Sequence, residues 1–373
     1  MKEGWTYKKL GECVEKTPKQ KQVKSKDYKS KGKYPIVSQE KDIISGYWDD
    51  EDYLFRHKKP VIVFGDHTKE IKYIDFDFVV GADGTQILQP KDNIDAKFFY
   101  YALKATPLRT LGYARHFKLL KEKSFKIFPL SEQQRIVKQL DEAFAEIDTI
   151  KAAAEKQLSE AKSLFQKALS KAMTPKEGWE EKTLKEIGDT QTGNTPSKND
   201  KSNYGDYIPF IRPAEINYDG LGNINYKSEM SLSEKGLENG RLFKSGSVFM
   251  VCIGATIGKV AISTQDVSCN QQINILTPNS NTNAKFAFYA MSSKAFNNKV
   301  LKEGMSAQAT LPIISKGKWE KLSIPIPPLS EQQRIVEELD ELAENVKEIE
   351  KLNDKLKAEC DAMKQALLRQ VFE

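Results

Sequence analysis

Two stretches of the chain carry apolar residues at alternating spacings of three and four, the pattern of one face of a long helix. The first stretch contains Leu140, Ala143, Ile147, Ile150, Ala154, Leu158, Ala161, Leu164 and Ala168. The second contains Leu339, Leu342, Val346, Ile349, Asn353, Leu356, Cys360, Met363 and Leu367. This spacing over four heptads predicts two coiled-coil helices, each about 60 Å long at 1.5 Å per residue.

The two predicted helices differ in the size of their seam residues. Small residues in the first (Ala154, Ala161, Ala168) stand where the second has Asn353, Cys360 and Leu367. We therefore expect the helices to pair with each other, antiparallel, rather than with copies of themselves, and Asn353 to fix the register at some cost in stability. The alternative is that each helix packs only on the globular segment before it.

The same nine residues, Pro-Leu-Ser-Glu-Gln-Gln-Arg-Ile-Val, open both helical stretches, at 129–137 and 328–336. A serine followed three residues later by glutamine has the spacing of a capping box, which satisfies free amides at a helix start. The predicted cap residues are Ser131, Gln134, Ser330 and Gln333.

A second repeat, Lys-Glu-Gly-Trp, begins at Lys2 and again at Lys176. The chain is therefore an internal duplication of a globular segment, here called a head, followed by a helix. The expected boundaries are 1–128 for head 1, 129–174 for its helix, 175–327 for head 2 and 328–373 for the second helix. The nine-residue copies are 199 residues apart and the Lys-Glu-Gly-Trp copies 174, so head 2 is longer by 25 residues.

Short apolar runs bounded by turn residues predict a mixed α/β (α+β) fold in each head. In head 1 the expected strands are 34–38, 60–64, 72–80 and 86–89, with a helix at 96–105. In head 2 they are 208–212, 246–253, 258–263 and 272–277, with a helix at 284–291. Matching dipeptides such as Thr17-Pro18 with Thr195-Pro196, and Tyr101-Ala102 with Tyr289-Ala290, indicate one shared fold.

Positive charge is concentrated in the heads. Head 1 has 26 basic residues against 18 acidic ones, a net +8, and head 2 has 18 against 15, a net +3. The helical segments carry 7 against 7 and 7 against 12, or 0 and −5. Eight lysines and one acid lie between Lys16 and Lys33, a composition suited to phosphate contact. The same segment could also be a solvated, mobile loop.

Other features limit the class of protein. The four cysteines show no Cys-x-x-Cys spacing, which argues against a disulfide framework or zinc ribbon and favours the reducing cytoplasm. No apolar run approaches the roughly 20 residues of a membrane span. There is no phosphate-binding glycine loop, and His57, His67 and His116 lack metal-ligand spacing, so we expect no catalysis and no metal.

The chain resembles the specificity subunit of type I restriction-modification enzymes over its whole length. The resemblance rests on the two repeated strings together with further stretches in a fixed order: Arg115–Leu120, Thr192–Ser197, Ile208–Pro213, Gly254–Gly258 and Asn270–Gln272. It implies two target-recognition domains that each read half of a bipartite double-stranded DNA site. It further implies that the helices dock two adenine-methyltransferase subunits and set the spacing, and that motor-nuclease subunits join the full complex. S-adenosylmethionine, ATP and Mg²⁺ would then belong to those partners.

Individual DNA contacts do not follow from the resemblance, so the candidates come from side-chain chemistry, since Arg, Lys, Asn and Gln can pair with base edges or phosphates. In head 1 they are Lys19, Lys21, Lys24, Lys26, Asp66, His67, Thr68, Arg115, His116 and Lys118. In head 2 they are Thr195, Ser197, Lys198, Arg212, Thr256, Asn270, Gln271, Gln272 and Gln308. For each residue an ordinary surface or fold-stabilising role is the alternative. Two other classes of protein stay open, a coiled-coil adaptor without DNA binding and a self-sufficient nuclease or methyltransferase.

Overall fold

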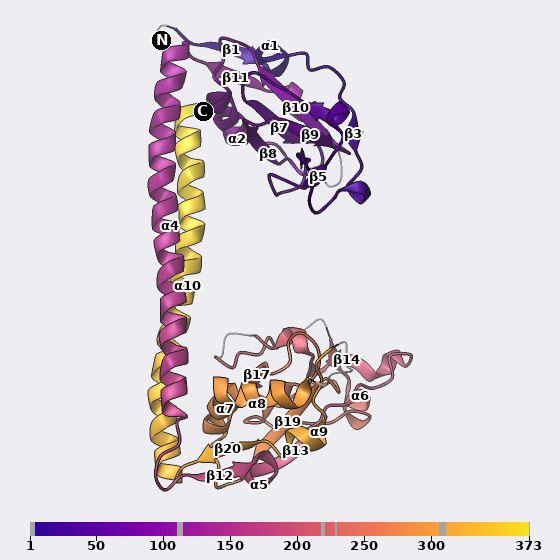
Figure 1. Cartoon of the computed structure of the whole chain (residues 1–373), viewed down its shortest axis with the longest axis vertical. Coiled ribbons are helices and arrows are strands. Elements are labelled where there is room, and N and C mark those ends of the chain that lie inside the picture. Colours follow the sequence, from indigo (N-terminus) through magenta and orange to yellow (C-terminus); the bar gives the residue numbers. More distant parts are fainter. Residues whose placement is uncertain (1–3, 110–114, 218–220, 228–229, 306–310, 373) are drawn as a thin grey trace. The chain divides into compact units, whose positions relative to one another are not determined.

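The structure, a computed structural model, describes residues 4–109, 115–217, 221–227, 230–305 and 311–372. It divides into two compact units, one made of residues 1–154 with 354–373 and the other of residues 155–353. Each unit contains one head together with part of both long helices (Figure 1). The duplication inferred from the sequence therefore corresponds to two compact units of the structure.

The described part of head 1 contains three sheets. A four-stranded antiparallel sheet has the order β2-β10-β7-β8, a second sheet has the order β3-β9-β4-β5 with β6 also on β9, and β1 pairs with β11. The strands are β1 Thr6–Lys9, β2 Val14–Glu15, β3 Gln22–Val23, β4 Tyr34–Val37, β5 Gly46–Trp48, β6 Leu54–Phe55, β7 Val61–Gly65, β8 Ile71–Ile74, β9 Phe78–Gly81, β10 Thr85–Pro90 and β11 Ser124–Ile127. The helices are α1 Leu10–Cys13, η1 Ser25–Asp27, η2 Glu51–Tyr53, α2 Ala96–Ala105 and α3 Phe117–Lys121.

Head 2 repeats this plan with the sheets β13-β19-β16-β17, β15-β14-β18 and β12-β20. The strands are β12 Glu180–Thr183, β13 Gly188–Thr192, β14 Tyr204–Ile211, β15 Ser231–Leu232, β16 Val248–Val251, β17 Val260–Ile262, β18 Ser268–Cys269, β19 Ile273–Pro278 and β20 Ser323–Ile326. The helices are α5 Leu184–Ile187, η3 Lys201–Asn203, η4 Pro213–Glu215, α6 Glu234–Glu238, α7 Ala284–Ser292, α8 Lys294–Gly304 and α9 Lys316–Trp319. The predicted α/β fold class is confirmed.

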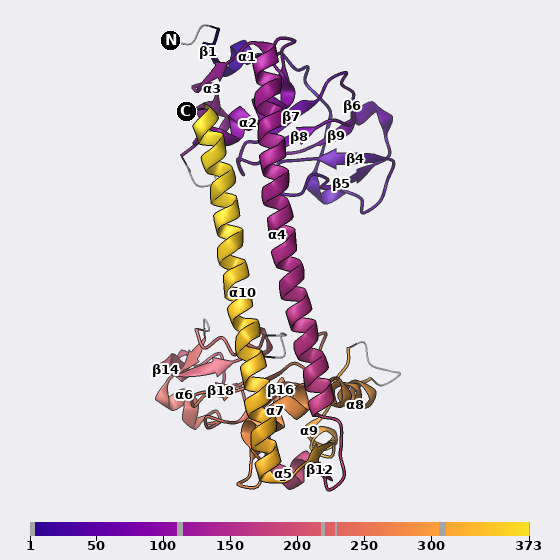
Figure 2. The same ribbon diagram turned by 90° about the vertical axis from the view of Figure 1, so that its left-hand side faces the viewer.

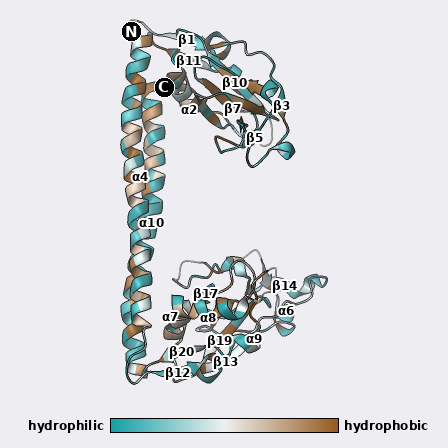
Figure 3. Ribbon diagram, in the orientation of Figure 1, coloured by the Kyte–Doolittle hydropathy of each residue, from teal (hydrophilic) through white to brown (hydrophobic). Residues whose placement is uncertain are grey.

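The first four-stranded sheet has the same connectivity in both heads, with β2, β10, β7 and β8 matched by β13, β19, β16 and β17. Of its central strands, β7 and β16 are buried along their whole length, and Figure 3 shows hydrophobic residues on β7 in head 1. Helices α2 and α7 follow the equivalent strands β10 and β19, and both contribute buried aromatic residues to the core. The two heads therefore share one fold, as the matching dipeptides indicated.

One predicted strand of head 1 is wrong. Residues 72–80 form two strands, β8 and β9, which belong to different sheets. Between them Asp77 accepts a hydrogen bond from the backbone N–H of His57, and His57 Nε2 lies 2.8 Å from the carbonyl oxygen of Phe76. Apolar residues continue across the break because both strands contribute buried residues. Periodicity alone therefore did not reveal that the chain passes from one sheet to another between β8 and β9.

The two long helices are α4 (Leu130–Ala172) and α10 (Leu329–Phe372), which lie side by side in Figures 1 and 2. In the first unit Asp148 and Lys151 of α4 pair with Lys364 and Asp361 of α10, at 2.6 and 2.9 Å. As the number rises on one helix it falls on the other. The expected antiparallel pairing is therefore confirmed.

Four seam residues were misplaced. Ile150, Leu164, Leu342 and Met363 are 51, 65, 39 and 56% exposed. Position 343 rather than 342 is buried on α10, and Phe165 rather than Leu164 on α4. A strict 3.5-residue repeat drifts around a straight helix of 3.6 residues per turn, which moves the buried line by one position along such long elements.

The predicted serine caps are also wrong. Both helices begin one residue before the serine, at Leu130 and Leu329, so Ser131 and Ser330 lie inside the first turn. The carbonyl oxygen of Pro129 accepts the backbone N–H of Glu132 and Gln133, and Pro328 does the same for Glu331 and Gln332. The proline carbonyl therefore takes first-turn amides that the sequence argument had assigned to the serine. Gln134 and Gln333 are exposed on the helices.

The fully buried polar residue of each nine-residue string is its first glutamine, Gln133 or Gln332. Gln133 Nε2 donates to the carbonyl oxygens of Asn93 and Phe128 at 3.0 and 2.7 Å, and its Oε1 accepts the backbone N–H of Asp95 at 2.8 Å. Gln332 repeats the arrangement with the carbonyls of Asn281 and Pro327 and the N–H of Asn283. Since Asp95 and Asn283 cap helices α2 and α7, each glutamine joins a long helix to the capped end of a head helix.

A second repeated contact lies two turns further along each long helix. Asp141 accepts hydrogen bonds from Tyr101 and Lys97 of α2, and Asp340 accepts them from Tyr289 and Lys285 of α7. Burial, and then the hydrogen bond to the aspartate, raises the pKa of both tyrosines, which therefore remain donors at neutral pH. Each long helix is thus fixed to the head that precedes it.

The far end of each long helix packs on the other head. Leu368 of α10 is buried in the core of head 1, and Phe372 packs against Phe98 with ring centroids 5.2 Å apart and the rings tilted by 56°. Phe165 and Leu169 of α4, and Met173 just after it, are buried in the core of head 2. The alternative in which a helix packs only on its own head is therefore wrong, because each head is completed by both helices. Among the described helices, none is long and apolar enough to cross a membrane.

Candidate nucleic-acid interface

Two turns lie side by side at one edge of head 1. The β7–β8 turn spans residues 66–70 and the β9–β10 turn spans 82–84, and the backbone N–H of Asp66 donates to the carbonyl of Gly84 at 2.8 Å. Gln39 joins the β7–β8 turn to the β4–β5 loop, because its Oε1 accepts a hydrogen bond from the N–H of His67 and its carbonyl accepts one from the Thr68 hydroxyl at 2.6 Å. Sequence reasoning missed Gln39, since its partners lie 28 and 29 residues away.

Asp66 and His116 form the support of this edge. They are 4 and 1% exposed, and the N–H groups of His116 and Phe117 donate to the Asp66 carbonyl and carboxylate at 2.8 and 2.7 Å. This contact places the start of α3 against the β7–β8 turn. Arg115 and Lys118 flank His116 and are exposed, as is Thr68, so these side chains are available to a ligand.

The lysine-rich segment of head 1 is ordered by the second sheet. Val23 is 3% exposed in β3, which pairs with β9, and the Val23 carbonyl accepts the N–H of Ala82 at 2.7 Å. The segment is therefore anchored beside the β9–β10 turn and is not a free loop. Its candidate residues are all exposed: Lys19, Lys21, Lys24 and Lys26.

Head 2 builds the same edge with other side chains. The β18–β19 turn, 270–272, meets the β16–β17 turn, 252–259, through the Cys252 N–H, which donates to the Gln272 carbonyl at 2.9 Å. Asn270 is 9% exposed and holds the turn, since its Oδ1 accepts the Gln272 N–H and its Nδ2 donates to Gln272 Oε1. Gln271 and Gln272 are exposed at the tip.

The loop after β13 lies against this turn. A Cβ on Gly193 would stand 2.1 Å from the Asn270 carbonyl oxygen, and the Thr195 hydroxyl donates to Gln271 Oε1 at 2.5 Å. The loop leads to the exposed Ser197 and Lys198. It follows β13 as the lysine-rich segment follows β2, so the candidate phosphate contacts of the two heads occupy equivalent segments.

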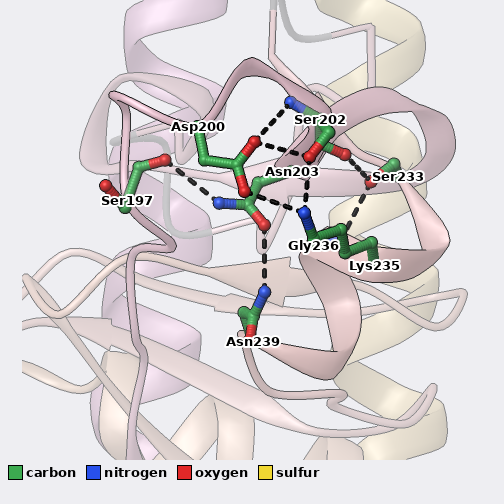
Figure 4. Close-up of polar contacts among 8 residues, drawn as sticks. All are labelled: Ser197, Asp200, Ser202, Asn203, Ser233, Lys235, Gly236 and Asn239. Atoms are coloured by element: carbon green, nitrogen blue, oxygen red, sulfur yellow. Dashed lines mark hydrogen bonds and ion pairs between the residues drawn. The ribbon is translucent and has the colours of Figure 1, made fainter.

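A polar network fixes the base of this loop (Figure 4). Asn203 Nδ2 donates to the Ser197 carbonyl at 3.1 Å, and Asn203 Oδ1 accepts from Asn239 at 3.0 Å. Asp200 accepts hydrogen bonds from Ser202 and, at 2.9 Å, from Lys235 of α6. The hydrogen bond from the Ser202 hydroxyl, then that from Lys235 and then that from the Ser202 N–H lower the pKa of Asp200 to about 2. The loop is thus held in one conformation by charged and neutral hydrogen bonds to α6.

Other predicted contact residues have different places. Arg212 forms two hydrogen bonds to the buried carboxylate of Glu215, at 3.2 and 2.7 Å, so its guanidinium supports η4. Thr256 lies in the β16–β17 turn. That turn is three residues longer than its counterpart. The ladders place Gly65 opposite Thr85 and Val251 opposite Ile273, so Val251 is the head 2 equivalent of Gly65. Gln308 lies outside the described residues.

A family model and proteins of similar sequence agree with this architecture. The family model described as "Type I restriction modification DNA specificity domain" matches residues 2–160 and 176–358. The specificity subunit of the Escherichia coli type I restriction enzyme EcoR124I/EcoR124II is 27% identical over 352 residues, covering 89% of this chain and 85% of that one. The MjaIX specificity subunit of Methanocaldococcus jannaschii is 29% identical over 190 residues, 48% of this chain and 42% of the relative.

A solved structure described as the "Structural basis underlying complex assembly and conformational transition of the type I R-M system" contains a chain with the same fold. The TM-score is 0.67 at 18% identity, with 98% of this chain and 97% of that chain covered.

Two α/β heads with the same edge of turns, each followed by a long helix, define a tandem recognition protein. The chain belongs to the family of type I restriction-modification DNA specificity domains. It is thus a DNA specificity subunit with two target-recognition domains. The family is non-catalytic, and catalysis resides in the methyltransferase and restriction subunits of these systems.

Proposed function

We propose that each head reads one half of a bipartite double-stranded DNA site through its edge of two adjacent turns. The observation that carries this proposal is that both heads build this edge by the same connections and expose different side chains on it. Head 1 presents Thr68, Arg115 and Lys118, and head 2 presents Gln271 and Gln272. One scaffold with two sets of side chains suits two different half-sites.

The exposed cations beside each edge contact phosphates in this proposal. They lie on the segment after β2 in head 1 and on the loop after β13 in head 2. Arg115 just before α3, and Gln271 and Gln272 on the β18–β19 turn, can instead pair with base edges. Asp66, His116, Asn270 and Arg212 support the fold around the contacts, since their polar atoms are engaged within the head. Phosphate contacts would position each head, and base contacts would give the sequence preference.

The paired helices are proposed to set the distance between the half-sites and to dock two adenine-methyltransferase subunits. Apolar side chains that stay exposed on both helices support docking: Ile150, Leu164, Leu352 and Met363. Motor-nuclease subunits would join the full complex. S-adenosylmethionine, ATP and Mg²⁺ would act in those partners, and the four free, buried cysteines are consistent with a cytoplasmic assembly.

The test is to express the chain with the methyltransferase encoded beside it and to map the methylated adenines. The expected map shows two fixed half-sites separated by a spacer of fixed length and free sequence. A control lacking the chain should leave the DNA unmodified. A continuous site, or methylation or cleavage by the isolated chain, would contradict the proposal.

A further inference from the structure

The ion pairs between α4 and α10 follow a rule. Lys151 pairs with Asp361 at 2.9 Å, Lys162 with Glu350 at 2.6 Å and Asp148 with Lys364 at 2.6 Å. In each pair the two residue numbers add up to 512, so all three belong to one antiparallel register. The pairs occur in both units, the first and third in one and the second in the other.

The internal repeat relates these residues to each other. Adding 199 converts Lys151 into the position of Glu350 and Lys162 into the position of Asp361. The two pairs are therefore one contact seen twice, with lysine always on α4 and the acid always on α10. Immediately after a duplication, both copies of a helix have the same residue at each matched position. The two copies have therefore since acquired opposite charges at these positions.

This arrangement has a consequence for the partner that each helix accepts. If α4 paired with a second α4 in the same register, Lys151 would face Lys162. If α10 paired with a second α10, Glu350 would face Asp361. Lys364 would then also face Lys347, the residue that the repeat places at the position of Asp148 on α4. Every one of the three ion pairs is lost in self-pairing, and three like-charge contacts replace them.

We propose that these charges are a pairing code by which α4 accepts α10 and rejects a copy of itself. The lysines are 30 and 36% exposed and the acids 67 and 37%, so each pair is weak alone. The apolar line sets the strength of helix association. The charges set its partner and register, as charged flanking residues do in coiled coils.

The experiment uses two full-length variants. Variant A carries Lys151→Glu and Lys162→Glu, so both of its helices are acidic at the four positions. Variant B carries Glu350→Lys and Asp361→Lys, so both of its helices are basic there. A third variant combines all four changes and restores opposite charges in one chain.

Alone, A and B should each melt several degrees below the wild type, and the combined variant should recover most of that loss. After A and B are unfolded and refolded together at low salt, α4 of A should pair with α10 of B, and α10 of A with α4 of B. Native mass spectrometry should then show a complex with one copy of each. The proportion of this complex should fall in refolding at high salt, because the discrimination is electrostatic.

The matched control is a pair of variants with Lys156→Glu and Lys167→Glu on α4, or Glu348→Lys and Glu359→Lys on α10. These residues are exposed on the helices. Mixing the controls should give no two-chain complex. The proposal would be overturned if A and B melted at the wild-type temperature and formed no mixed complex. Dimers formed by A alone would also overturn it. If A or B fails to fold alone, recovery of folded protein only from the mixture still supports it.

Discussion

The side-chain oxygen of Gln133 accepts the backbone N–H of Asp95 over 2.8 Å, and 199 residues later Gln332 accepts the N–H of Asn283 over the same distance. We expect Gln332→Ala to lower the free energy of unfolding by about 1–3 kcal/mol, because it leaves buried backbone groups without partners. Gln133→Ala should have a similar effect. The exposed neighbour provides the control, so Gln134→Ala should change stability by less than about 0.5 kcal/mol in urea unfolding. Equal effects at positions 133 and 134 would contradict this role.

Gly236 is required by the loop network of head 2. A Cβ at this position would stand 1.8 Å from the Asn203 carbonyl oxygen, so Gly236→Ala should cost about 1–3 kcal/mol by overpacking and displace the loop that carries Ser197 and Lys198. Gly317→Ala in α9 of the same head meets nothing within 4 Å and should be neutral or slightly stabilising. The measurement is urea unfolding together with recognition of the half-site read by head 2. Unchanged stability of the first variant would show that the loop moves freely.

The lysines after β2 should contribute to affinity for all DNA sequences. Changing Lys21, Lys24 and Lys26 to glutamine should weaken binding and lower the log–log salt slope by up to about one unit per lost phosphate contact. The control changes three exposed helix lysines, Lys156, Lys167 and Lys171, to glutamine, which alters the net charge equally. Binding is measured in the complex with the methyltransferase. An equal decrease of the salt slope in both variants would mean that DNA affinity depends only on the net charge of the chain.

Gln271 tests whether the heads act separately. Gln271→Ala should cost about 1–3 kcal/mol at one base pair of one half-site and leave the other half-site unchanged. Thr195→Val, which removes the hydroxyl that donates to Gln271, should relax the same position by a smaller amount. The readout is the methylated-adenine map over all base substitutions. Loss of discrimination in both half-sites would argue against two independent heads.

The length of the paired helices should set the DNA spacer. The ion-pair register requires that both helices be extended together, so four residues are inserted after Ala153 and four after Leu352, the repeat-related position. This adds about 6 Å, and at 3.4 Å per base pair the preferred spacer should grow by one or two base pairs with both half-sites unchanged. Insertion in α4 alone should instead destabilise the pair. Activity on the original spacing after the double insertion would exclude the helices as the ruler.

Local patterns were sufficient for much of the fold. Helix α2 begins and ends where its capping aspartate and apolar face indicate, at Ala96 and Ala105, and the 3,4 spacing located both long helices. The positions of Gln133 and Gln39 were not predictable, because their partners lie tens of residues away in the sequence. The serine cap was misassigned because a proline carbonyl supplies the same hydrogen bonds, which a residue pattern does not distinguish.

For the site, sequence reasoning selected polar residues in turns without separating supports from exposed groups. Asp66 and Thr68 are two residues apart, yet one is buried under the edge and the other is exposed on it. That distinction depends on the contact of Asp66 with the start of α3, 51 residues further along the chain. The base contacts themselves remain predictions.

The packing of Leu368 and Phe372 in head 1 also imposes an order on folding during synthesis. The ribosome makes head 1 first, but the core of head 1 includes residues that are made after all of head 2. At about 5–20 residues per second, the roughly 200 residues between positions 154 and 354 take about 10–40 s. During that interval the apolar face of head 1 that receives α10 is uncovered. The nascent chain is therefore expected to require a chaperone at this stage, and head 1 reaches its native core only after the end of α10 has been synthesised.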